Sequence, residues 1–272
     1  MSATVDYEVE YNNRARVPEN PDIMAGWARD AAAWRERHSP RTIAYGAGAR
    51  HTIDLFDANL EGPIVVFIHG GYWQALDGSF FSHLARGLNA HGVGVAVPSY
   101  DLCPAVGVDD IVRQMRFAAR ELARLGRPLV LSGHSAGGHL AACLLATDWP
   151  ALDPSLPRNL VVAAYAISGL FDLVPLVETS INKALGLDQA TARAVSPLFW
   201  QPPEHGSLDA VVGSNESAEF FRQSRGIVEA WGRAGVLTRF DTVPGANHFT
   251  AIAPLAEPGS AMVARLRELA GG

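Results

Sequence analysis

Residues 129–142, LVLSGHSAGGHLAA, decide the fold, because they join an apolar run to a glycine-rich turn and then to a helical pattern. The central residues 133–137, GHSAG, match the pattern G-x-S-x-G in the strand–turn–helix setting that this pattern requires. A serine there occupies a sharp, strained turn, and the flanking glycines leave room for neighbouring backbone. The sequence therefore predicts Ser135 as a nucleophile that shares its space with the Ala136 N–H at a helix N-terminus. A chance glycine-rich turn would not explain this setting.

An earlier stretch, VVFIHGGYWQAL at residues 65–76, has a related construction. Residues 64–68 read as a strand buried on both faces, and the glycines after it allow backbone N–H groups to approach a ligand closely. A loop of this kind supplies further oxyanion donors to a serine nucleophile on a later strand. We therefore expect the N–H groups of Gly71 and Tyr72 to form an oxyanion hole with Ala136. We interpret His69 as a structural hydrogen-bonding residue.

The base and the acid of a serine nucleophile should follow it in the order Asp or Glu, then His. Of nine histidines, only His205 and His248 lie well beyond the serine. His248 is favoured because it falls in a loop between the last predicted strand and the C-terminal helix, whereas His205 precedes a strand. For the acid we favour Glu216, three residues past the strand that ends at Gly213. The alternative, Glu219, should already lie within the next helix.

Apolar runs alternate with helical patterns along most of the chain. The predicted strands are 64–68, 92–98, 128–133, 160–168, 208–213 and 237–243, and the predicted helices are 79–90, 108–125, 136–147, 216–234 and 259–270. This alternation predicts an α/β fold with a mostly parallel central sheet flanked by helices, and a site outside the carboxyl ends of the strands.

The remaining segments fit one domain over residues 1–272. Residues 1–40 read as an arm and a helix, and 42–46 and 49–58 read as two antiparallel edge strands. The proline-rich residues 171–204 are too long for a simple connection, so we expect a small helical cap over the strand ends. The apolar stretch 20–36 predicts either a homodimer contact or a cover for the sheet edge.

Composition excludes several classes of partner. A net charge of -6 disfavours nucleic acid and anionic membranes, and no apolar stretch reaches the ~18 residues of a membrane span. The polar first residues and two cysteines, Cys103 and Cys143, predict a cytoplasmic protein without a disulfide framework, in which both thiols pack in the core. We expect a small-molecule substrate as the partner.

Metal and cofactor sites are not indicated. His134 and His139 flank the serine, but their spacing is not a usual ligand spacing and no Cys or Asp cluster accompanies them. The sequence holds no phosphate-binding glycine loop and no dinucleotide fingerprint. We therefore expect no metal and no organic cofactor.

The arrangement resembles the α/β-hydrolase superfamily and, more narrowly, the kynurenine formamidases (arylformamidases) and their bacterial relatives. The resemblance is carried by EYNNRARVP at 10–18, HGGYW at 69–73, SYDLCP at 99–104, GHSAGGHL at 133–140 and ESAEFFRQS at 216–224. HGGYW stands in place of the HGGG of hormone-sensitive-lipase-type esterases. One departure is Glu216, where the family often has aspartate.

The resemblance implies hydrolysis of N-formyl-L-kynurenine to L-kynurenine and formate, with no cofactor. An acyl pocket narrowed by Tyr72 would accept formyl and disfavour longer chains. As candidates for the apolar surface under the aryl ring, the sequence offers Trp73, Phe171, Phe199 and Trp200, although each fits core or lid packing equally well. For the substrate carboxylate it offers Arg222 and Arg225 without favouring either.

Two other functions remain open at this point. A general carboxylesterase for short-chain acyl or aryl esters would use the same three residues. A catalytically inactive hydrolase fold that serves as a binding protein would not need them, and the intact Ser, Glu and His set argues against it.

Overall fold

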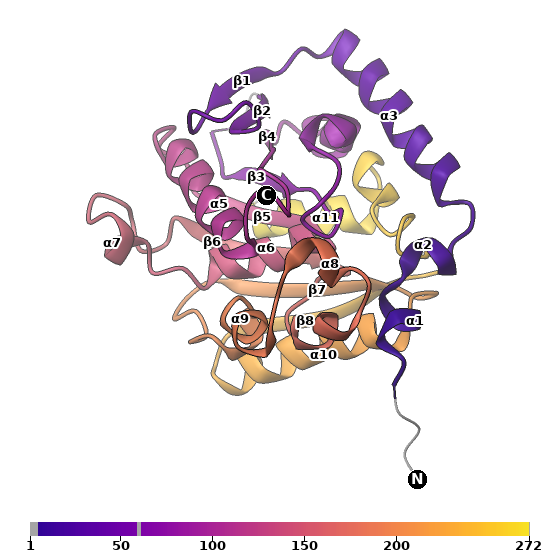
Figure 1. Ribbon diagram of the computed structural model, residues 1–272. Helices are drawn as coiled ribbons and strands as arrows, with labels where there is room; N and C mark the ends of the chain where they lie inside the picture. Colours follow the sequence, from indigo (N-terminus) through magenta and orange to yellow (C-terminus); the bar gives the residue numbers. More distant parts are fainter. Residues whose placement is uncertain (1–4, 59–60, 272) are drawn as a thin grey trace.

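The computed structural model describes residues 5–58 and 61–271, which form one eight-stranded sheet with helices on both faces (Figure 1). The strands are β1 (Arg41–Ala44), β2 (Thr52–Phe56), β3 (Ile64–Ile68), β4 (Val95–Pro98), β5 (Leu129–His134), β6 (Val161–Ile167), β7 (Ser207–Gly213) and β8 (Leu237–Val243). Their order in the sheet is β1-β2-β4-β3-β5-β6-β7-β8.

The sheet is parallel from β4 to β8, and only the β1–β2 and β2–β4 pairs are antiparallel. Every residue of β3 and β5 is buried, as expected for strands covered on both faces. The predicted α/β fold is therefore confirmed. β5 lies between β3 and β6, so the turn after it meets the loop after β3 at the same edge.

The helices divide between the two faces of the sheet. The α-helices are α1 (Tyr7–Tyr11), α2 (Asn13–Arg16), α3 (Asn20–Arg37), α4 (Ala85–Asn89), α5 (Val108–Ala123), α6 (Ala136–Leu145), α7 (Trp149–Leu152), α8 (Asn182–Leu185), α9 (Gln189–Ala194), α10 (Ala218–Arg233) and α11 (Ala261–Leu269), and the 3-10 helices are η1 (Gly78–Leu84), η2 (Val174–Glu178), η3 (Pro197–Phe199) and η4 (Ala253–Ala256). Residues of α5, α6 and α10 belong to one buried cluster, and residues of α3, η1, α4 and α11 belong to the other.

Helix α3, in the N-terminal part of the chain, packs against the 3-10 helix η1. Trp27 and Ala31 are buried, and the Trp27 ring lies 5.3 Å from that of Phe81 in η1. Apolar side chains of the stretch 20–36 are thus buried against other parts of the same chain. The homodimer contact stays a prediction. No helix among the described residues is both long and apolar enough to cross a bilayer.

Two segments that are far apart in the sequence reach the carboxyl ends of the strands. The arm, residues 5–18, carries α1 and α2, and the expected cap, residues 171–204, consists of the short helices η2, α8, α9 and η3 (Figure 1). They meet where the Glu8 carboxylate accepts hydrogen bonds from the N–H and hydroxyl groups of Ser180, at 2.7 and 2.8 Å. The sequence did not predict this contact.

Candidate active site

Ser135 sits at the junction of β5 and α6, in a conformation that few residues adopt. Its φ of 56° and ψ of -118° lie outside the usual regions for an L-residue, and its N–H donates to the Ile167 carbonyl at 2.8 Å. The turn closes only because Gly137 lacks a side chain, since a Cβ there would lie 1.9 Å from the Ile68 carbonyl oxygen. The structure therefore has the strained turn that the motif predicted.

The loop after β3 presents backbone donors beside this turn. Gly71, Tyr72 and Trp73 have φ values of 109°, 48° and 57°, a run of positive angles that turns the backbone sharply. Within the described ranges, the N–H groups of Gly71 and Tyr72 donate no hydrogen bond. Two unused donors next to a helix N-terminus suit the binding of an anion.

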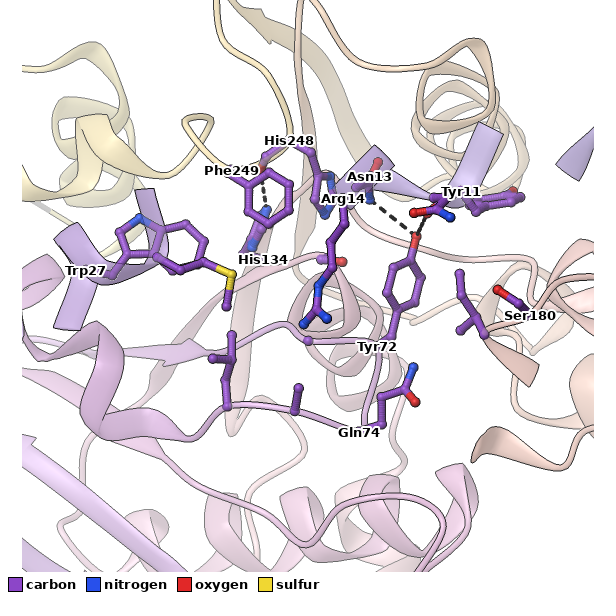
Figure 2. A pocket seen from close by; sticks show the side chains of 17 residues that line it. Tyr11, Asn13, Arg14, Trp27, Tyr72, Gln74, His134, Ser180, His248 and Phe249 are labelled. Atoms are coloured by element: carbon purple, nitrogen blue, oxygen red, sulfur yellow. Dashed lines mark hydrogen bonds between the residues drawn. The ribbon is translucent and has the colours of Figure 1, made fainter. Parts of the chain in front are cut away.

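The Tyr72 side chain is fixed by the N-terminal arm. Its hydroxyl donates to the Tyr11 carbonyl at 2.7 Å and accepts from Asn13 Nδ2 at 3.3 Å (Figure 2). The ring thus forms a fixed wall next to the unused donors.

His69 supports the loop from below. Burial lowers its pKa to about 4, and its ring stacks on Tyr100 with the two ring centroids 4.2 Å apart. A neutral, enclosed imidazole that hydrogen-bonds to the Gly70 carbonyl fits a structural role.

His248 and Glu216 form a pair at the carboxyl ends of β7 and β8. His248 Nδ1 lies 2.7 Å from Glu216 Oε2, and the glutamate side chain is fully buried. The other carboxylate oxygen accepts hydrogen bonds from the Gly213 N–H, at 2.7 Å, and from the Ser168 hydroxyl. Because Nδ1 faces the carboxylate, Nε2 is the ring nitrogen left for proton transfer.

The two rival residues lie in other surroundings. His205 precedes β7 and so lies at the far end of that strand. Glu219 binds the Arg222 guanidinium and accepts a hydrogen bond from the Tyr11 hydroxyl at 2.7 Å, and these two described residues, Glu219 and His248, share no hydrogen bond or ion pair.

A cavity of about 380 Å³ brings the predicted residues together. Ser135, His248, Gly71 and Tyr72 all line it, and the Ala136 N–H lies at the start of α6 beside it. Within residues 5–58 and 61–271, the Ser135 hydroxyl and the His248 imidazole line the same cavity without being hydrogen-bonded to each other. Contacts of this kind in ligand-free sites often tighten only when substrate is bound.

The cavity has an apolar side and a polar side. Figure 2 shows Trp27 and Phe249 on one side and Gln74 and Ser180 on the other, with His248 between them. Met24 and Leu76 add to the apolar lining. This division suits a ligand with an aromatic part and a polar part.

None of the four aromatics expected under the substrate ring lines this cavity. Trp73 is fully buried and meets the His139 ring edge-on, with the two ring centroids 5.0 Å apart. Phe171 is also fully buried in the core.

The other two aromatics belong to the insertion and face arginines. The Arg193 guanidinium lies over the Phe199 ring, with its Cζ 3.8 Å from the ring centroid. The Trp200 indole N–H donates to the Ala194 carbonyl, and Arg116 lies over its ring. The cap contributes Ser180 and Ile181 to the cavity instead.

Sequence reasoning missed the contribution of the N-terminal arm. Residues 11–14 line the cavity, together with Met24 and Trp27 of α3. A signal was present in the run YNNR, which places amide and cationic groups beside an aromatic one. Its distance along the chain from the serine concealed its place in the site.

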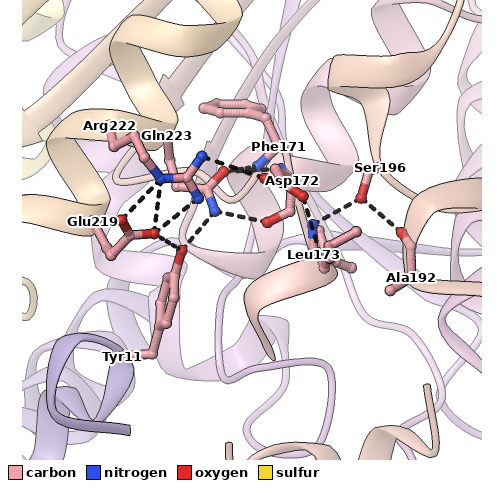
Figure 3. Close-up of polar contacts among 10 residues, drawn as sticks. Tyr11, Phe171, Asp172, Leu173, Ala192, Ser196, Glu219, Arg222 and Gln223 are labelled. Atoms are coloured by element: carbon pink, nitrogen blue, oxygen red, sulfur yellow. Dashed lines mark hydrogen bonds and ion pairs between the residues drawn. The ribbon is translucent and has the colours of Figure 1, made fainter. Parts of the chain in front are cut away.

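A buried polar network holds the arm in position (Figure 3). The Tyr11 hydroxyl donates to Glu219 and accepts from Gln223 Nε2 at 2.8 Å. Gln223 also accepts hydrogen bonds from the N–H groups of Phe171 and Asp172, at 2.8 and 2.9 Å. The network therefore joins the arm to α10 and to the start of the insertion.

The histidines that flank the serine do not form a metal pair. His134 Nε2 donates to the His248 carbonyl at 2.8 Å, whereas His139 Nε2 donates to the Val195 carbonyl at 2.7 Å. Burial lowers the pKa of both, to about 4 for His139. Among the described residues, no group of three or more His, Cys, Asp or Glu side chains is placed to hold a metal ion. Cys103 and Cys143 are buried free thiols.

Comparison with known proteins places the chain in a family. A kynurenine formamidase from Salmo salar is 32% identical over 228 residues, which span 79% of this chain and 76% of that protein. One from Danio rerio is 31% identical over 241 residues, which span 84% and 81%. No family model matches the chain.

Solved structures share the fold. A provisionally assigned thioesterase from a Silicibacter species superposes with a TM-score of 0.85 at 37% identity, over 96% of this chain and 98% of that one. An esterase from Pyrobaculum calidifontis, at 18% identity and a TM-score of 0.70 over 92% of both chains, shows the fold alone. The identity to these kynurenine formamidases over most of both chains, together with the fold, shows that this chain belongs to the kynurenine formamidase family of α/β-hydrolases.

Proposed function

We propose that the protein is an arylformamidase that hydrolyses N-formyl-L-kynurenine to L-kynurenine and formate, with Ser135 as nucleophile. The observation that carries the proposal is the convergence of Ser135, the His248–Glu216 pair and two unused backbone donors on one cavity. The kynurenine formamidases that resemble this chain over most of its length support the choice of substrate.

The reaction proceeds through a formyl-serine intermediate. His248 Nε2 takes the proton of the Ser135 hydroxyl while the serine oxygen bonds to the formyl carbon. The N–H groups of Gly71, Tyr72 and Ala136 bind the oxyanion, and one such donor contributes about 3 kcal/mol to lowering the barrier. The C–N bond then breaks, and His248 gives the proton to the departing aryl amine.

Water completes the cycle by the same route. His248 takes a proton from water, the hydroxide oxygen bonds to the formyl carbon, and the second tetrahedral intermediate expels the serine oxygen. This releases formic acid, which loses its proton to solvent and becomes formate. The proton returns to the serine oxygen. Glu216 holds the imidazole in the required tautomer and stabilises the imidazolium.

The cavity walls support a small acyl group and an aryl leaving group. The Tyr72 ring, fixed by the arm, limits the space beside the oxyanion donors. Trp27, Phe249, Met24 and Leu76 offer the apolar surface on which an aryl ring packs. The cavity volume of about 380 Å³ lies in the range that holds small organic ligands.

We also propose a cytoplasmic location. The two cysteines are free thiols, and burial raises the pKa of Cys103 to about 11. Unreactive thiols without a disulfide fit a reducing compartment.

A substrate comparison tests the proposal. We expect kcat/KM for N-formyl-L-kynurenine to exceed that for p-nitrophenyl acetate, and that for p-nitrophenyl butyrate to be lower still because Tyr72 limits the acyl pocket. A preference for butyrate over the formamide would replace arylformamidase with the general carboxylesterase.

A further inference from the structure

Arg14 is the one side chain lining the cavity that carries a permanent charge, within the part of the chain that the structure describes. Among the same described residues, no carboxylate lines the cavity beside it. Figure 2 shows the Arg14 side chain extending from the arm toward the middle of the cavity, between His134 and Tyr72. The cavity therefore offers a cation to any ligand that reaches the serine.

The Arg14 guanidinium has no ion-pair or hydrogen-bond partner among the described residues. Its backbone, by contrast, is held firmly. Asn20 Nδ2 donates to the Arg14 carbonyl at 3.1 Å, and the preceding residue, Asn13, bonds to the Tyr72 hydroxyl. An arginine with a fixed base and an unused planar fork is prepared to bind a carboxylate in a bidentate manner.

The two arginines that the sequence offered for this role are occupied elsewhere. Arg222 pairs with Glu219 at 2.8 Å and with Asp172 at 3.3 Å, in the network of Figure 3. Arg225 lies over the rings of Phe221 and Phe240. Neither lines the cavity.

Gln74 adds a second unused polar group on the same side. Its side-chain amide lines the cavity, and within residues 5–58 and 61–271 it makes no hydrogen bond. An amide offers both a donor and an acceptor, as an amino acid zwitterion requires.

We propose that Arg14 binds the carboxylate of the substrate and so restricts the enzyme to acylated aryl amines that carry an amino acid group. This inference rests on the proposed function and assigns Arg14 to binding alone, apart from the groups that move protons. The apolar side of the cavity holds the ring, and Arg14 with Gln74 holds the charged end.

Loss of the charge should weaken binding of the anionic substrate and leave neutral substrates unaffected. Hydrogen bonds to a charged group are worth enough to change KM by about 10- to 100-fold when they are removed. The change should appear in KM more than in kcat, because the contact is present before and during the reaction.

The experiment measures kcat and KM for N-formyl-L-kynurenine and for 2-formamidoacetophenone, which has the same formanilide but no amino acid group. The variants are Arg14→Met, Arg14→Lys and, as a matched control, Arg29→Met, an exposed arginine of α3 that does not line the cavity. Thermal melting checks that each variant folds.

We expect Arg14→Met to raise KM for N-formyl-L-kynurenine by about 10- to 100-fold and to leave KM for 2-formamidoacetophenone unchanged. For Arg14→Lys, KM for N-formyl-L-kynurenine should lie between the values of Arg14→Met and the wild type. Arg29→Met should match the wild type. The proposal would be overturned if the ratio of the KM values for the two substrates were the same in Arg14→Met as in the wild type. An equal rise in KM for N-formyl-L-kynurenine in Arg29→Met would overturn it as well.

A second measurement separates this inference from the proposed function. L-Kynurenine and 2-aminoacetophenone are compared as inhibitors of p-nitrophenyl acetate hydrolysis, in the wild type and in Arg14→Met. Carboxylate binding by Arg14 is supported if L-kynurenine inhibits the variant more weakly than the wild type while 2-aminoacetophenone inhibits both equally. This holds even if the wild type fails to hydrolyse N-formyl-L-kynurenine. Equal inhibition of both proteins by L-kynurenine would overturn the inference.

Discussion

At the scale of single residues, the proposed acid of the site, Glu216, is a buried glutamate whose carboxylate oxygens both have partners. Its carboxylate contacts His248 Nδ1, the Gly213 N–H and the Ser168 hydroxyl. These partners fix the carboxylate and, through it, the plane of the imidazole. Glutamate has a longer side chain than the aspartate that the family often has here. It reaches the histidine because Glu216 stands in a turn that folds back on the end of β7.

Glu216→Gln should therefore lower kcat about 10³- to 10⁴-fold, because an amide cannot stabilise the imidazolium and favours the wrong tautomer. The matched control is Glu219→Gln, which removes the other glutamate of the same segment. Its effect should fall on thermal stability, since Glu219 pairs with Arg222 and Tyr11. Steady-state kinetics on both variants check this. Comparable losses of kcat would contradict the assignment of the acid.

The sequence was informative about residues whose motifs dictate their surroundings. Ser135 follows from the strand–turn–helix pattern, and His248 and Glu216 follow from chain order and strand ends. The four aromatics expected under the substrate ring do not line the cavity, because an aromatic residue near a strand end packs in the core as readily as in a cavity. Trp73 follows Tyr72 directly, yet its ring is fully buried while Tyr72 lines the site.

At the scale of elements, the site depends on the close contact between the β5–α6 turn and the end of β3. Gly137 in the first turn of α6 lies against the Ile68 carbonyl, where a Cβ would come within 1.9 Å of the oxygen. The first turn of α6 and the end of β3 are both backbone in buried elements, so moving either one aside would cost packing energy.

Gly137→Ala should consequently destabilise the fold by several kcal/mol or prevent folding, which thermal or denaturant unfolding measures. The control is Gly226→Ala in α10, where nothing lies within 4 Å of the added Cβ. That variant should be more stable by about 0.5–1 kcal/mol, because alanine favours the helix. A Gly137→Ala variant as stable as the wild type would contradict the close packing described for the turn.

The arm shows what local patterns could not predict. Its two short helices have few apolar residues, and their place depends on partners more than 200 positions away, such as Glu219 for Tyr11. Such contacts leave no periodic trace in the sequence. The long strands and helices were predicted with small errors at their ends, although the helix expected at 79–90 begins as the 3-10 helix η1 and becomes α-helical only at α4.

At the scale of the whole molecule, neutral histidines are enclosed near the centre of the sheet's carboxyl edge. Burial lowers the pKa of His69 and His139 to about 4, and lowers that of His134 as well. In the unfolded chain, histidine titrates near pH 6.5. The unfolded state therefore binds more protons than the folded state as the pH falls below that value.

The free energy of unfolding should be constant above about pH 6.5 with respect to these groups and should fall as the pH decreases toward 4. His69 and His139 should each account for roughly 3 kcal/mol of this fall, and His134 should act in the same direction. His139→Gln keeps a donor for the Val195 carbonyl but cannot take up a proton. Its unfolding free energy should decline less steeply than that of the wild type over this range. Denaturant unfolding at several pH values measures the slopes, and parallel profiles for the two proteins would contradict the account.

The proposed role of Ser135 as the carrier of the formyl group is tested by the initial rate of L-kynurenine release from N-formyl-L-kynurenine, measured for the wild type and for Ser135→Ala. We expect turnover by the wild type and a loss of about 10⁴- to 10⁶-fold in the variant, with unchanged thermal melting. Release of L-kynurenine by a folded Ser135→Ala variant at a rate near that of the wild type would contradict it.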